Sequence, residues 1–154
     1  MLIYLMRHGA AQLQAESDQA RQLTPQGRAD NQAVLAKFTE RSPCPDRCLV
    51  SPYIRAEQTA QGLLQEYPQW CFSSCELLTP EADLQLLLSF MDSIDAENLL
   101  MVGHNPLLSD LLNLLVSSGR NATTGLYLGT SALACVSCDV LAPACGKLSY
   151  LLEP

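Results

Sequence analysis

The sequence predicts a three-layer α/β/α sandwich built on a mostly parallel central sheet with an antiparallel edge strand. Two observations carry this prediction. Short apolar runs alternate with stretches whose apolar residues recur at helical spacing, through most of the 154 residues. Two apolar runs close the chain, at residues 133–138 and 148–152, and are expected to pair at a sheet edge. The length suits a single domain, residues 1–154.

The first half of the chain begins with an apolar, β-branched and aromatic run that stops at Arg7 and is typical of a buried parallel strand. Thr24 and Pro25 predict a helix start, as N-cap and first helical residue. The expected elements are, in order, a strand from residue 2, a polar loop at 10–24, a helix from 25 to about 41, a turn at 42–46, a strand at 48–50, a helix at 53–66 and a strand within 70–78.

The second half continues the alternation. Its expected elements are a helix at 81–91, a buried strand at 99–103, a helix that begins at Asn105-Pro106 and carries leucines to residue 115, a loop at 119–131, and the closing strand pair. No internal repeat or low-complexity segment interrupts this order.

The charge balance limits the classes of partner. The chain has 16 acidic and 9 basic residues, a formal net charge of −7, whereas nucleic-acid-binding domains carry basic faces. The first residues lead straight into a strand and do not resemble a secretion signal, and no apolar run is long enough to cross a bilayer. We expect a cytoplasmic protein that binds neither nucleic acid nor membranes, and we expect a monomer.

Seven cysteines are an odd number that does not suit a disulfide framework. Six of them form close pairs that could suggest zinc, although no histidine lies near: Cys44 and Cys48, Cys71 and Cys75, Cys135 and Cys138. An odd separation on a strand directs the last pair to opposite faces of a sheet. We therefore expect ordinary thiols, no metal and no cofactor.

Three of the expected strands end in reactive or cationic residues. These ends are Arg7-His8-Gly9 after the first strand, Ser51-Pro52 followed by Arg55 after the second, and Gly103-His104-Asn105 after the fourth. Because parallel strands place their carboxyl ends on one side of a sheet, these side chains should meet there. The chain has only two histidines, and both lie at these ends.

Such a set of side chains suits phosphoryl transfer. A transferring phosphoryl group spreads negative charge over three equatorial oxygens and needs several fixed donors. Arg7 and Arg55 offer planar forks for two oxygens at once, and His104 can donate to a third. A neutral imidazole such as His8 can attack phosphorus, while Gly9 leaves room for backbone beside the phosphoryl group.

The three motifs resemble those of the histidine phosphatase (phosphoglycerate mutase-like) superfamily in order and spacing across most of the chain. The matching segments are Arg7-His8-Gly9, Ser51-Pro52-x-x-Arg55-Ala56-x-x-Thr59-Ala60 and Gly103-His104-Asn105-Pro106. The resemblance implies that His8 is the nucleophile and becomes transiently phosphorylated, and that Arg7, Arg55 and His104 complete the phosphate pocket. Gly9 and Asn105 are further candidate substrate contacts.

The general acid is the least determined part of the expected site. Many relatives use a glutamate that follows the second motif, where this chain has Glu81 and Asp83. Asp18 in the first loop is the preferred candidate here, and Glu16 is a lesser one. An alkoxide leaving group needs a proton in the transition state, but phosphohistidine expels an imidazole, a better leaving group, so the acid is less necessary for that substrate.

The resemblance, with which the leaving-group argument is compatible, implies a hydrolase that acts on a phosphohistidine-bearing protein, such as a histidine-containing phosphotransfer domain. A phosphatase of the same mechanism for sugar or nucleotide phosphates is an alternative. A phosphate-binding regulatory module without catalysis is another, and the intact His8 counts against it.

Overall fold

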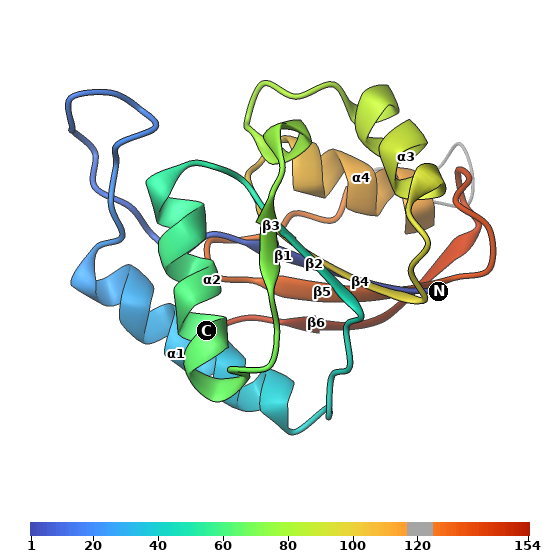
Figure 1. The fold of residues 1–154 in the computed structure, drawn as a ribbon, viewed down its shortest axis with the longest axis horizontal. Helices are drawn as coiled ribbons and strands as arrows, with labels where there is room; N and C mark the ends of the chain where they lie inside the picture. The colour runs from blue at the N-terminus through green and yellow to red at the C-terminus, as the bar shows by residue number, and fades with distance from the viewer. Residues whose placement is uncertain (117–124) are drawn as a thin grey trace.

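A computed structural model describes residues 1–116 and 125–154 of the chain. It confirms the α/β sandwich: two helices cover each face of one six-stranded sheet (Figure 1). The strands are β1 (Leu2–Arg7), β2 (Arg47–Val50), β3 (Phe72–Ser74), β4 (Asn98–Gly103), β5 (Leu133–Cys138) and β6 (Gly146–Leu152). The helices are α1 (Pro25–Thr39), α2 (Ile54–Glu66), α3 (Leu84–Ser93) and α4 (Leu107–Val116), with a 3₁₀ turn at Glu76–Leu78.

The sheet has the strand order β3-β2-β4-β1-β5-β6. Strands β1 to β4 are mutually parallel, and β5 runs antiparallel to both β1 and β6, which confirms the closing strand pair. Arg7 lies opposite Gly103, and Val50 lies opposite Val102. The carboxyl ends of β1, β2 and β4 therefore reach the same edge of the sheet.

Successive strand residues pack into two separate cores because their side chains point to opposite faces. Ile3 and Leu5 pack in the core under α3 and α4, whereas Tyr4 and Met6 pack in the core under α1 and α2. The cysteines of β5 follow the same rule, since Cys138 lies in the first core and Cys135 in the second.

The element boundaries follow local capping chemistry. Helix α1 begins as expected, because the Thr24 side chain accepts the Gly27 N–H at 3.0 Å. Helix α3 begins later than expected, because the Asp83 carboxylate caps the N–H groups of Gln85 and Leu86. Of the loop expected at 119–131, residues 119–124 lie outside the described part, and residues 125–131 are neither helix nor strand.

No helix within residues 1–116 or 125–154 combines the length and the hydropathy needed to cross a bilayer.

Candidate active site

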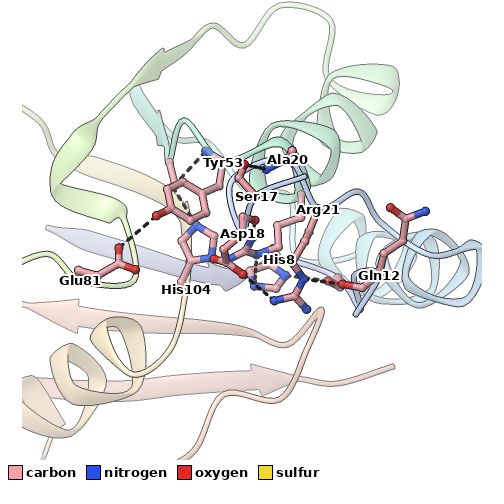
Figure 2. Close-up of polar contacts among 12 residues, drawn as sticks. His8, Gln12, Ser17, Asp18, Ala20, Arg21, Tyr53, Glu81 and His104 are labelled. Atoms are coloured by element: carbon pink, nitrogen blue, oxygen red, sulfur yellow. Dashed lines mark hydrogen bonds and ion pairs between the residues drawn. The ribbon is translucent and has the colours of Figure 1, made fainter. Parts of the chain in front are cut away.

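The carboxyl edge of the sheet brings together side chains from three strand ends. His8 follows β1, Arg55 lies in the first turn of α2 just after β2, and His104 follows β4. The rings of His8 and His104 have centroids 4.8 Å apart, and Figure 2 shows the two rings side by side. All three side chains are buried, with relative exposures of 8% for His8, 4% for Arg55 and 1% for His104.

The two ring nitrogens of His8 have different partners. Nδ1 lies 2.7 Å from the Gly9 carbonyl oxygen, and because a carbonyl only accepts, Nδ1 carries the proton. Nε2 then carries the lone pair, which accepts from Arg55 Nε at 3.2 Å. Burial lowers the pKa of His8 to about 4; the charges of Arg55 and Arg7 act in the same direction and the Gly9 carbonyl opposes them. His8 is therefore neutral at neutral pH, with a nucleophilic nitrogen at Nε2.

Asp18 holds Arg55 in place. Arg55 Nη1 donates to the Asp18 carbonyl at 2.6 Å and Nη2 donates to Asp18 Oδ2 at 2.9 Å, while Asp18 Oδ1 accepts from Arg21 at 2.7 Å. The hydrogen bond from Arg21, and then that from Arg55, lowers the pKa of the Asp18 carboxyl. Asp18 thus lies at the site, but as an ionised partner of two arginines, which argues against its expected role as proton donor.

Arg7, the last residue of β1, contacts the loop that precedes β5. Its Nη1 donates to the Tyr127 hydroxyl and to the Leu128 carbonyl, both at 3.0 Å. Its Nε is buried and has no hydrogen-bond partner in the described residues. The hydrogen bond from Arg7 lowers the pKa of Tyr127. Sequence reasoning did not select Tyr127, which lies in a stretch without periodicity or motif.

His104 contacts Ser51 at the end of β2. Its Nε2 lies 2.8 Å from Ser51 Oγ, and its Nδ1 is buried without a partner in the part of the chain that the structure describes. Burial, then the charges of His8 and Arg55, lowers the pKa of His104 to about 2. The ring also packs edge-on against Tyr53, with centroids 5.0 Å apart.

Gly9 is required by a close approach between β1 and α1. A Cβ on Gly9 would lie 2.6 Å from the Gly27 carbonyl oxygen and 2.8 Å from Asn31 Oδ1. The Gly9 N–H donates to Thr59 Oγ1 at 3.2 Å, which links the loop after β1 to α2. Thr59 belonged to the recognised motif, but the sequence did not indicate its role.

Asn105 lies beside His104 and braces the loop that precedes β5. Its Nδ2 donates to the Leu128 carbonyl at 2.8 Å, and its Oδ1 accepts from Ser109 at 2.9 Å. The same Leu128 carbonyl accepts from Arg7. The amide therefore fixes the loop that positions Arg7.

The other three carboxylates that the sequence offered as general acids, Glu81, Asp83 and Glu16, do not contact His8, Arg55 or His104 through any hydrogen bond within the described residues. Glu81 lies at the rim, where its Oε2 accepts from the Tyr53 hydroxyl at 3.2 Å (Figure 2). Asp83 is occupied as the cap of α3, and Glu16 is exposed in the first loop. Within the described ranges, no group of three or more His, Cys, Asp or Glu is arranged to hold a metal ion.

Comparisons with known proteins agree with this arrangement. Residues 3–71 match the family model of the histidine phosphatase superfamily (branch 1). The chain is 34% identical over 148 residues to phosphohistidine phosphatase SixA of Escherichia coli strain K12, covering 90% of this chain and 86% of that protein. It is 31% identical over 145 residues to the SixA homolog of Haemophilus influenzae, covering 86% of each chain.

A solved structure of the protein histidine phosphatase SixA in complex with tungstate superposes with a TM-score of 0.86. The identity is 28%, and the match covers 100% of this chain and 97% of that one. The chain therefore belongs to the histidine phosphatase superfamily, and within it to the family of SixA-like phosphohistidine phosphatases.

Proposed function

We propose that this hydrolase removes the phosphoryl group from a phosphohistidine on a protein, through a transient phosphohistidine on its own His8. The observation that carries the proposal is the state of His8 Nε2. The Gly9 carbonyl holds the ring proton of His8 on Nδ1, so Nε2 carries the lone pair, which faces Arg55 Nε at 3.2 Å. The ring is neutral at neutral pH. A buried, neutral and oriented imidazole is an activated nucleophile.

The reaction has two displacements. In the first, the Nε2 lone pair of His8 forms a bond to phosphorus, while the bond from phosphorus to the substrate imidazole breaks and the imidazole leaves with that electron pair and takes up a proton from solvent. In the second, a water oxygen bonds to phosphorus and the water releases one proton to solvent, which balances the proton taken up in the first step; the bond to His8 Nε2 breaks, and inorganic phosphate leaves. His8 regains its lone pair, so the cycle consumes one water.

The donors around His8 suit the transferring oxygens. Arg55 lies against Nε2 in the resting site, so its guanidinium meets the phosphoryl group as that group arrives. Arg7 Nε and His104 Nδ1 are buried and unpartnered among the described residues, and a buried polar group without a partner is costly unless a ligand satisfies it. The tungstate of the SixA structure is a tetrahedral oxyanion, which supports an oxyanion pocket in this chain.

The proposed substrate class follows from the leaving group. Two relatives are phosphohistidine phosphatases by name. Asp18, which contacts the same Arg55 guanidinium as His8, has a lowered pKa and is poorly suited to protonate an alkoxide. Phosphohistidine releases an imidazole instead. A phosphorylated carrier protein is therefore favoured over a sugar or nucleotide phosphate.

The test compares the turnover of a phosphohistidine protein with that of a panel of sugar and nucleotide phosphates, for wild type and His8→Ala. We expect wild type to prefer the phosphohistidine protein and His8→Ala to lose activity on every substrate. Labelled phosphate trapped on wild-type protein should be stable in alkali and labile in acid, as a phosphoramidate is. A preference for small molecules would reject the substrate class, and turnover by His8→Ala would reject the nucleophile.

A further inference from the structure

We propose that Ser51 is a positioning residue that fixes the proton of His104 on Nδ1, so that neutral His104 acts as a hydrogen-bond donor to the phosphoryl group. This inference rests on the proposed function for its catalytic consequence, but the position of the proton is a property of the resting protein. It can therefore be measured without any substrate.

Ser51 and His104 form a closed contact at the end of β2. Ser51 Oγ lies 2.8 Å from His104 Nε2, and the two residues have relative exposures of 0% and 1%. At this distance, and between two buried residues, the contact is a hydrogen bond in which one of the two atoms donates a proton. Either Ser51 donates to a bare Nε2, or a protonated Nε2 donates to Ser51.

The surroundings of Ser51 favour the first arrangement. The backbone N–H of Tyr53 points to Ser51 Oγ at 3.4 Å, so the hydroxyl oxygen already faces a donor. Within residues 1–116 and 125–154, His104 Nε2 is the acceptor available to the single hydroxyl proton of Ser51. If Nε2 carried the proton, the buried Ser51 hydroxyl would have no acceptor, at a cost of about 1–3 kcal/mol.

The consequence lies on the other side of the His104 ring. A neutral imidazole carries one proton, so donation from Ser51 to Nε2 places that proton on Nδ1. Burial keeps His104 neutral, since its pKa falls to about 2. Nδ1 is the buried atom without a partner in the described residues. As an N–H it attracts a phosphoryl oxygen, whereas as a bare nitrogen it would repel one.

The two histidines are then held in the same tautomer by opposite means. The Gly9 carbonyl is an acceptor at Nδ1 of His8, and the Ser51 hydroxyl is a donor at Nε2 of His104. His8 consequently offers its lone pair at Nε2, and His104 offers its proton at Nδ1. With ring centroids 4.8 Å apart, one ring can supply the nucleophile and the other the donor for the same phosphoryl group.

Nitrogen-15 NMR of the 154-residue chain, without an affinity tag and near pH 7, tests the proton position directly. The chain has two histidines, so the spectrum contains two imidazoles, and His8→Asn assigns them. We expect a protonated Nδ1 and a bare Nε2 on His104 in wild type. In Ser51→Ala we expect the proton to shift toward Nε2, and Ser51→Thr should restore the wild-type pattern. A protonated Nε2 on wild-type His104 overturns the proposal.

Kinetics supply the second readout. Loss of a hydrogen-bond partner that orients a metal-binding imidazole lowers activity by about 10- to 100-fold, and we expect Ser51→Ala to show an effect of similar size in kcat, with a smaller change in KM. Ser137→Ala is the control, because Ser137 lies opposite Leu2 at the other end of the sheet and its Oγ donates only to the Lys147 carbonyl within the described residues. It should leave the His104 tautomer and kcat unchanged.

The outcomes separate this inference from the proposed function. If Ser51→Ala keeps both the wild-type tautomer and kcat, Ser51 does not position His104. If Ser51→Ala fails to fold, wild type and Ser51→Thr still decide the tautomer by NMR. If wild type does not act on phosphohistidine, the proposed function fails while the position of the proton is still measured.

Discussion

The buried state of His8 makes the stability of the protein depend on pH in a specific window. The native fold disfavours the imidazolium, so the pKa of His8 falls from an ordinary 6.5 to about 4. The unfolded chain therefore binds the additional proton between these two values. Because the unfolded chain binds this proton more readily, the free energy of unfolding falls as the pH drops from about 6.5 to about 4. The contribution of His8 to stability is complete above about pH 6.5 and levels off below about pH 4.

The size of the effect follows from the same two pKa values. A difference of about 2.5 pKa units corresponds to about 3 kcal/mol in full, of which about 2 kcal/mol is lost between pH 7 and pH 5. Urea unfolding of wild type and His8→Asn at both pH values measures it, because the titrations that the two proteins share cancel in the difference. We expect the wild type to lose about 2 kcal/mol more than the variant on going to pH 5.

An equal loss of stability in wild type and His8→Asn would refute this reasoning. It would mean that His8 titrates in the native state as it does in an unfolded chain. An NMR titration of the His8 ring supplies an independent check, since the expected midpoint lies near pH 4 and a midpoint near 6.5 would again contradict a buried imidazole that is neutral at neutral pH.

Three further predictions concern neighbours of His8. Arg55→Lys should lower kcat/KM by at least about 100-fold in steady-state assays, because an ammonium cannot contact His8 Nε2, the Asp18 backbone carbonyl and Asp18 Oδ2 at once. Wild-type kinetics for this variant would contradict the prediction. Asp18→Asn should lower kcat/KM only about 2- to 5-fold, as expected for a half-exposed ion pair, whereas complete loss would restore Asp18 as an acid. Gly9→Ala should destabilise the fold in urea by about 1–3 kcal/mol, since its Cβ meets backbone and the Asn31 side chain. Gly62→Ala, in open space on α2, should not destabilise it.

Much of the fold could be predicted because it depends on local patterns. The Thr24-Pro25 cap predicted the start of α1, and the continuous apolar run at residues 2–6 predicted the buried strand β1. The meeting of His8, Arg55 and His104 also followed from the sequence, because parallel strands bring their carboxyl ends to one edge. These inferences need only backbone periodicity and strand direction.

What could not be predicted depends on distances between segments far apart in the chain. Asp18 appeared as a free carboxylate in a polar loop, and only the fold shows it between Arg21 and Arg55, with a lowered pKa. Tyr127 follows no motif and reaches Arg7 across 120 positions of sequence. The start of α3 was expected too early because Asp83 was considered as an acid and not as a cap.

The distribution of proton donors bears on the proposed substrate class. The centre of the site is rich in hydrogen-bond donors, with Arg7, Arg55 and the buried His104 around His8, so it is built to attract an oxyanion. The carboxylate nearest to Arg55 is ionised, and Glu81 stands at the rim, tied to the Tyr53 hydroxyl. A site with a strong nucleophile and strong oxyanion donors, but with its acids outside the centre, accelerates reactions whose leaving group departs without help. Imidazole leaving from phosphohistidine meets that condition, and the alkoxide of a sugar phosphate does not.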